Sequence, residues 1–151
     1  MVDAAKQPHG KNLRKCRVSL PNQIYLVTAV TASREPVFAS FDTARIAARC
    51  FHDKDIVRQA QTLAFVVMPD HIHWLLQIAE GGDLSSAVRL YKAKVSMLLG
   101  QRMWQRGFHD HALRSDEDMR CVAQYIMANP VRAGLVRSVG DYPHWDAIWL
   151  L

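Results

Sequence analysis

The chain has 151 residues, of which half are hydrophobic and 22% are charged, a composition typical of one globular domain with its own core. No apolar run approaches the ~20 residues that a membrane span needs. The three cysteines are scattered and form no CxxC pair, which argues against a disulfide framework and favours a reducing, cytoplasmic setting. The formal net charge is +5, which favours a polyanionic partner.

Sequence patterns predict strands and helices in the order βαββαβα. The strands are rich in apolar and β-branched residues and fall at 23–31, 62–68, 71–78 and 104–114. The first helix starts near Asp42. The second is capped by Asp83 and ends at Gly100. The last starts at Ser115, with capping-box spacing to Asp118, and stops at Asn129-Pro130.

This order is that of an α+β, ferredoxin-like fold, a βαββαβ unit with an antiparallel sheet, here with an additional C-terminal helix. We expect residues 1–20 to form a basic N-terminal arm and residues 21–151 to form a single domain. The aromatic tail, 139–151, is expected to pack back on the body. The fold alone implies no activity.

Basic residues are concentrated in two stretches of the chain. Residues 84–109 contain no Asp or Glu, and residues 1–20 contain only one, Asp3. Charge alone fits a solvated helix face and a loose arm as well as it fits a phosphate-contacting surface. The candidate nucleic-acid contacts are Arg14, Lys15, Arg17, Arg89, Lys92, Lys94, Arg102, Arg106 and, after the last helix, Arg132.

The run FVVMPDHIHWLLQI places two histidines in a strand that otherwise looks buried. Side chains alternate along a strand, so His71 and His73 point the same way, ~7 Å apart along the chain, while Ile72 and Trp74 face the core. Two imidazoles at this spacing can bind one metal ion. The motif alone is weak, and on these residues alone two half-exposed histidines bonded to water or to neighbours are the favoured explanation.

A second pair, His109 and His111, flanks Asp110. Three interpretations of this pair are a polar edge strand, a rival metal site and a set of DNA-contacting side chains. The polar residue between the two histidines favours the edge strand, and the other two interpretations stay open.

The last helix carries an apolar stripe made of Met119, Val122, Ala123, Ile126 and Met127. Tyr125 lies about 120° from the centre of this stripe. Asn129 is four residues further on and is expected on the same side. The helix therefore presents a phenol and an amide away from its core face, although a tyrosine packed on a loop would show the same pattern. Tyr91, in contrast, lies on the apolar stripe of its own helix and is expected in the core.

At these positions the sequence resembles a known family. MPDHIHWLL is similar to the His-hydrophobic-His motif of the single-tyrosine HUH transposases (IS200-like). QYIMANPVRAGLV resembles the tyrosine helix of their REP-associated branch, and WQRGFHDHALR and DYPHWDAIWL are also similar to that branch. The resemblance runs from about Val18 to the C-terminus.

The resemblance implies a metal-dependent endonuclease and strand transferase that acts on single-stranded DNA. Such enzymes form a 5′-phosphotyrosine link and leave a free 3′-OH. It implies Tyr125 as the nucleophile, and His71, His73 and Asn129 as ligands of Mg²⁺ or Mn²⁺. Asn129 stands where the insertion-sequence branch has glutamine. The implied substrates are hairpins of repeated extragenic palindromes, bound by a monomer or a homodimer, with no organic cofactor and no membrane partner.

Two other functions fit the same pattern. One is a catalytically silent nucleic-acid-binding module, since RNA-recognition domains share this topology, although the chain lacks their RNP1 pattern. The other is a metal-dependent nuclease that uses water, with a purely structural tyrosine. A covalent DNA adduct distinguishes the transposase from both.

Overall fold

The computed structural model describes residues 22–114 and 117–150. Its centre is a five-stranded antiparallel sheet in the order β4-β1-β3-β2-β5. The strands are β1 (Ile24–Val30), β2 (Ala60–Met68), β3 (His71–Ile78), β4 (His109–Ala112) and β5 (Trp145–Ala147). The first four strands and the helices between them follow the predicted βαββαβ order. β5 is an additional edge strand that was not predicted.

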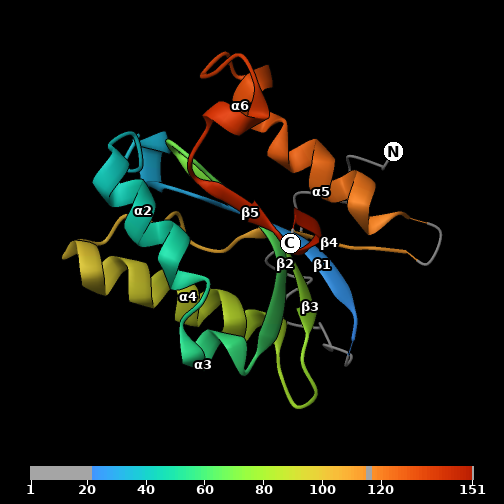
Figure 1. Ribbon diagram of the computed structural model, residues 1–151. Helices are drawn as coiled ribbons and strands as arrows, with labels where there is room; N and C mark the ends of the chain where they lie inside the picture. The colour runs from blue at the N-terminus through green and yellow to red at the C-terminus, as the bar shows by residue number, and fades with distance from the viewer. Residues whose placement is uncertain (1–21, 115–116, 151) are drawn as a thin grey trace.

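Helices cover both faces of the sheet. They are α2 (Phe41–Cys50), α3 (Lys54–Val57), α4 (Leu84–Leu99), α5 (Met119–Met127) and α6 (Asn129–Arg132). Short 3-10 turns lie at η2 (Ala32–Arg34), η3 (Val139–Asp141) and η4 (Ile148–Leu150). The first three helices lie together on one face, and α5 and α6 lie on the other (Figure 1). Within the described ranges, every helix is too short or too polar to cross a membrane.

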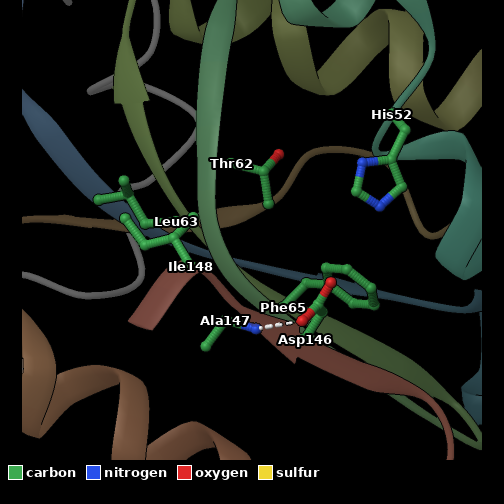
Figure 2. A pocket seen from close by; sticks show the side chains of 7 residues that line it. All are labelled: His52, Thr62, Leu63, Phe65, Asp146, Ala147 and Ile148. Carbon is green, nitrogen blue, oxygen red and sulfur yellow. Dashed lines mark hydrogen bonds between the residues drawn. The ribbon is translucent and has the colours of Figure 1, made fainter. Parts of the chain in front are cut away.

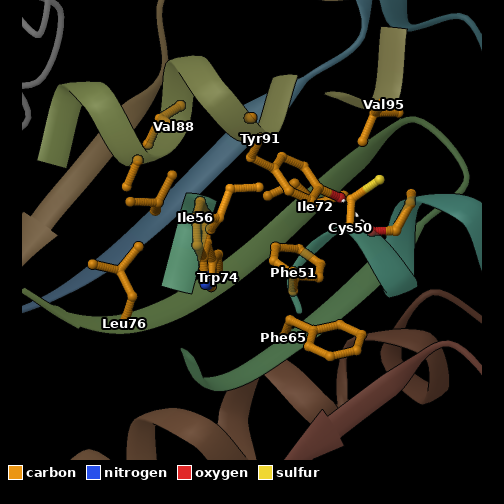
Figure 3. Packing of buried hydrophobic residues seen from close by; sticks show 14 of the residues in the cluster. Cys50, Phe51, Ile56, Phe65, Ile72, Trp74, Leu76, Val88, Tyr91 and Val95 are labelled. Atoms are coloured by element: carbon orange, nitrogen blue, oxygen red, sulfur yellow. Dashed lines mark hydrogen bonds between the residues drawn. The ribbon is translucent and has the colours of Figure 1, made fainter. Parts of the chain in front are cut away.

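The larger core lies between the sheet and the α2–α4 layer. The predicted alternation of β3 is confirmed, because Ile72 and Trp74 are fully buried there (Figure 3). Phe51 stacks between Phe65 and Tyr91, with ring centroids 4.4 Å and 4.2 Å away. Tyr91 is fully buried, as predicted, and its hydroxyl donates to the Ala47 carbonyl oxygen at 2.9 Å.

A smaller core lies on the opposite face, where α5 packs on the sheet. Ala123 and Ile126 are buried against Leu63, Val66 and Leu75, among others, which confirms the predicted apolar stripe of this helix. The C-terminal tail packs back as expected. β5 pairs with β2, and the Tyr142 hydroxyl donates to the Val67 carbonyl oxygen at 2.5 Å.

Two predicted elements are shorter in the structure. The helix expected from Asp42 onward breaks after Cys50, and Asp53 then caps the separate helix α3 by accepting from the Asp55 amide at 2.9 Å. The strand expected at 104–114 pairs with β1 only over 109–112. Trp104 makes just an isolated bridge to Thr31, and the chain then bends at Arg106 and Gly107, where Gly107 has φ of 79°, before β4 begins.

The last helix begins later than predicted and is followed by another. α5 starts at Met119, and its N-cap is Asp118, whose carboxylate accepts from the Arg120 amide. Ser115, the expected cap, lies outside the described residues. The helix ends before Asn129-Pro130, as predicted, but α6 starts at that point because proline fits the first turn of a helix.

Candidate active site

His71 and His73 lie side by side on β3, on the face covered by α5 and α6. Their ring centroids are 4.8 Å apart, and the ring planes are nearly perpendicular at 82°. Both side chains are half-buried. The sequence-based prediction that the two imidazoles share one face is confirmed.

Each imidazole is held through its Nδ1 atom. The His71 Nδ1 atom lies 2.7 Å from Asp70 Oδ1, and the His73 Nδ1 atom lies 2.9 Å from Thr28 Oγ1. Thr28 reaches His73 because the two residues are direct partners in the pairing of β1 with β3. Because Nδ1 is engaged in each ring, Nε2 is the atom through which each imidazole could bind a metal ion.

His73 is biased strongly toward its neutral form. Burial lowers its pKa to about 4, and the positive charges of His71 and Arg132 act in the same direction. A metal ion binds neutral imidazole. Because His73 is already neutral near neutral pH, it can act as a ligand without first losing a proton.

Tyr125, Asn129 and Arg132 form one cluster where α5 meets α6. Tyr125 is 65% exposed, which confirms that it lies off the apolar stripe. The Arg132 guanidinium sits over its ring, 3.9 Å from the centroid, and Arg132 Nη2 donates to Asn129 Oδ1 at 2.8 Å. Arg132 therefore links the phenol, the amide and, through its charge, His73.

The donor set fits a divalent ion with open coordination positions. In residues 22–114 and 117–150, no group of three or more His, Cys, Asp or Glu side chains could hold a metal ion. The histidines would therefore supply two nitrogen ligands, and further ligands would be amide oxygen or water, a set that suits Mn²⁺ or Mg²⁺. The Asn129 amide oxygen has a second lone pair beside the one facing Arg132.

The second histidine pair lies on the same face of the sheet, further toward its edge. His109 is the partner of Thr28 in the pairing of β1 with β4, so His109, Thr28 and His73 form one row across three strands. His111 Nε2 lies 3.0 Å from Glu117 Oε1. The pKa of Glu117 is lowered by the Arg114 backbone amide and by His111. A hydrogen bond with Glu117 thus engages His111, and both histidines are exposed.

The comparison with protein families decides what kind of protein carries this site. The family model described as "Transposase IS200 like" matches residues 19–129, which include the histidine pair and the tyrosine helix. The chain belongs to the IS200-like transposase family.

Its relatives include REP-associated tyrosine transposases. The protein of that name from Escherichia coli K12 is 39% identical over 82 residues, covering 53% of this chain and 50% of the relative. A putative REP-associated tyrosine transposase from Haemophilus influenzae is 31% identical over 100 residues, covering 56% and 57%. The matches thus span about half the length of these curated relatives.

A solved structure shares the fold of this IS200-like chain over most of its length. It is a REP-associated tyrosine transposase bound to a REP hairpin, with a TM-score of 0.70 and 28% sequence identity. The match covers 85% of this chain and 79% of the other.

Three of the predicted basic contacts that the structure describes lie on the face opposite the histidines of this transposase-family domain. Arg89, Lys92 and Lys94 are on α4, in the layer on the opposite face of the sheet (Figure 1). The Lys92 ammonium donates to the carbonyl oxygens of Gln105 and Gly107, and Lys94 pairs with Asp53 at 3.0 Å, so both have structural roles.

Three other predicted contacts, Arg14, Lys15 and Arg17, fall outside the described residues, as does the expected arm. Arg102 and Arg106 are exposed in the loop before β4. Of the predicted basic residues that the structure describes, only Arg132 touches the tyrosine cluster. The role of the others in DNA binding stays a prediction.

Sequence reasoning missed the partners of the two histidines. Asp70 had a local signal, since it directly precedes His71 in the sequence. Thr28 had none, because only strand pairing brings it to His73, and neither had Arg34, which a loop brings to within 3.1 Å of Asp70.

A separate hollow lies between β2, β5 and the end of α2. It is lined by His52, Thr62, Leu63, Phe65, Asp146, Ala147 and Ile148 (Figure 2). None of the predicted site residues lines it. The Asp146 carboxylate is used locally, accepting from the Ala147 amide at 2.8 Å, so this hollow adds nothing to the proposed chemistry.

Proposed function

We propose that this protein is a metal-dependent endonuclease and strand transferase that acts on hairpin-forming single-stranded DNA, with Tyr125 as the nucleophile. The observation that carries the proposal is the cluster in which Arg132 contacts both Tyr125 and Asn129, on the same face of the sheet as His71 and His73. Family membership supports the chemistry, and the relative bound to a REP hairpin supports the choice of substrate.

Attack by Tyr125 would form a bond between its phenolic oxygen and the phosphorus atom. The bond from phosphorus to the 3′ oxygen breaks, which gives a 5′-phosphotyrosine and a free 3′-OH. The phenol loses a proton and the departing oxygen gains one. Because the new link keeps the energy of the broken phosphodiester, the strand can be rejoined by the reverse attack.

Phenols ionise well above neutral pH, so a tyrosine nucleophile needs assistance. His71, His73 and Asn129 would hold Mg²⁺ or Mn²⁺, which would act as a Lewis acid on a phosphoryl oxygen. Arg132 offers the planar, bidentate geometry that suits phosphate, next to the nucleophile. Its proposed role is to place the scissile phosphate beside the phenolic oxygen.

The test is a search for the covalent adduct with two labelling schemes. A single-stranded hairpin oligonucleotide is incubated with the full chain and Mn²⁺, and the products are separated on a denaturing protein gel. A label on the 3′ side of the cut should move to the protein band. A label on the 5′ side should stay on a shorter strand that a polymerase can extend.

The alternatives give different results in the same assay. A nuclease that uses water would cut the hairpin and leave no labelled protein. A silent binding module would retain the hairpin on a native gel and would not cut it.

A further inference from the structure

Asp70 lies in the turn between β2 and β3, and its carboxylate joins two side chains. One oxygen lies 2.7 Å from His71 Nδ1, and the other lies 3.1 Å from Arg34 Nε. An ionised carboxylate can only accept hydrogen bonds, so Nδ1 of His71 must carry the hydrogen. The ring then has its lone pair on Nε2, the atom available to a metal ion.

Among the residues that the structure describes, none offers His73 a carboxylate of this kind. Its Nδ1 atom faces the Thr28 hydroxyl at 2.9 Å, and a hydroxyl can either donate or accept. Thr28 therefore orients the His73 ring but does not fix its tautomer. Of the two histidines, only His71 has its tautomer set by its neighbour.

The backbone that presents Arg34 is sterically unfavourable. Ser33 and Arg34 both have left-handed conformations, with φ of 55° and 54°, which residues with a Cβ rarely adopt. Neighbouring contacts hold this loop. The Ala32 amide donates to the Met103 carbonyl oxygen at 2.7 Å, and the Arg34 amide donates to the Thr31 carbonyl oxygen at 3.1 Å.

The same loop also fixes the turn that carries Asp70. Thr31 is fully buried, and its amide donates to the Asp70 carbonyl oxygen at 3.0 Å. The Phe38 amide donates to the Pro69 carbonyl oxygen at 2.9 Å. Both ends of the pair between Arg34 and Asp70 are therefore held by backbone hydrogen bonds.

We propose that Asp70 and Arg34 are positioning residues for metal binding: Asp70 fixes the tautomer and orientation of His71, and Arg34 holds the Asp70 carboxylate in place. The proposal rests on the proposed function, in which His71 is a ligand. Arg34 is 61% exposed, and ion pairs this exposed stabilise a fold very little, so fold stability does not explain the unfavourable backbone. Carboxylate partners of metal-binding histidines have this effect in other metal sites.

The first arm of the test reads the tautomer directly in the metal-free, full-length chain. Long-range ¹H–¹⁵N spectra of the histidine rings should show His71 with its hydrogen on Nδ1. Asp70→Ala should shift His71 toward the form with hydrogen on Nε2. Asp70→Asn keeps an oxygen that can accept and should keep the wild-type tautomer. An Asp70→Ala spectrum in which His71 is unchanged would overturn the proposal.

The second arm measures Mn²⁺ affinity by titration without DNA. Asp70→Ala should weaken binding ~10- to 100-fold, the usual effect of removing such a partner. Arg34→Gln should weaken it less and should leave the His71 tautomer intact. Asp55→Ala, which removes an exposed carboxylate paired with Arg58 on α3, is the matched control and should bind Mn²⁺ like the wild type.

The two proposals can fail separately. If the wild type forms no DNA adduct but Asp70→Ala still changes the His71 tautomer, the proposed function is wrong and the positioning role stands. If the adduct forms and Asp70→Ala retains both the tautomer and the Mn²⁺ affinity, the positioning role is wrong. If Asp70→Ala unfolds, Asp70→Asn takes its place. Loss of the Nδ1 hydrogen from His71 in Asp70→Asn would also contradict the proposal.

Discussion

Arg132 covers the ring of Tyr125 with its guanidinium 3.9 Å from the ring centroid, and the same side chain donates to Asn129. The contact joins α6 to α5 across the break at Ala128. A cation over an aromatic face is attractive, so the contact holds the phenol in one place while leaving it exposed.

Tyr125→Phe should abolish the covalent adduct and cleavage, since phenylalanine cannot attack phosphorus. The side chain is mostly exposed, so the free energy of unfolding should change by under ~1 kcal/mol. Hairpin binding should survive, because it depends on phosphate and base contacts elsewhere. Adduct gels, hairpin titrations and urea unfolding test the three expectations.

Tyr91→Phe is the matched control for this variant. It removes the hydrogen bond to the buried Ala47 carbonyl oxygen and should cost about 1–3 kcal/mol of stability. It should still form the adduct. A Tyr125→Phe protein that cuts DNA at a near wild-type rate would instead make water the nucleophile.

Arg132→Ala should lower the cleavage rate more than it lowers hairpin affinity, because Arg132 is expected to place one phosphate rather than to supply most of the binding. Loss of a charge-assisted contact to phosphate corresponds to about 1.5–3 kcal/mol, or roughly a 10- to 100-fold slower rate. Single-turnover cleavage and hairpin titration measure the two effects.

Arg132→Lys should recover only part of the rate, since lysine keeps the charge but lacks the planar fork. Arg58→Ala, on the opposite face of the sheet and paired with Asp55, should cut like the wild type. Equal rates for wild type and Arg132→Ala would remove Arg132 from the site.

His71→Ala and His73→Ala should each abolish metal-dependent cleavage while leaving hairpin binding within a few-fold of wild type. In the proposed function their Nε2 atoms would be the nitrogen donors to the metal ion, and a metal site that loses one of two protein nitrogens loses most of its affinity. Mn²⁺-dependent cleavage and hairpin titration are the measurements.

His109→Ala tests the rival histidine pair in the same assays. It lies on the same face as His73 but beyond Thr28, and it should retain cleavage. If His109→Ala loses cleavage while both β3 histidine variants keep it, the wrong histidine pair has been assigned to the metal.

Hairpin binding should weaken with salt and should depend on strandedness. Each phosphate neutralised on a single strand should contribute about −0.7 to the slope of log affinity against log salt concentration. A fully paired duplex of the same sequence should bind less tightly than the hairpin at matched salt. Equal affinities in a fluorescence titration would rule out the single-strand preference.

The sequence by itself determined which face of its own strand or helix each candidate residue occupies. Alternation along β3 is a local property, so it placed His71 and His73 together and buried Trp74 on the other face. The helical period is local as well, and it separated exposed Tyr125 from buried Tyr91. The βαββαβ order followed from the same two periodicities.

Only the tertiary structure decided which groups meet across elements. The register of β1 against β3 brings Thr28 to His73, and a loop with left-handed backbone brings Arg34 to Asp70. The separate helix α6 folds Arg132 back onto Tyr125, a contact that depends on the break at Ala128. The charge pattern could not show that α4 lies on the face opposite the histidines, because composition does not encode which side of a sheet a helix covers.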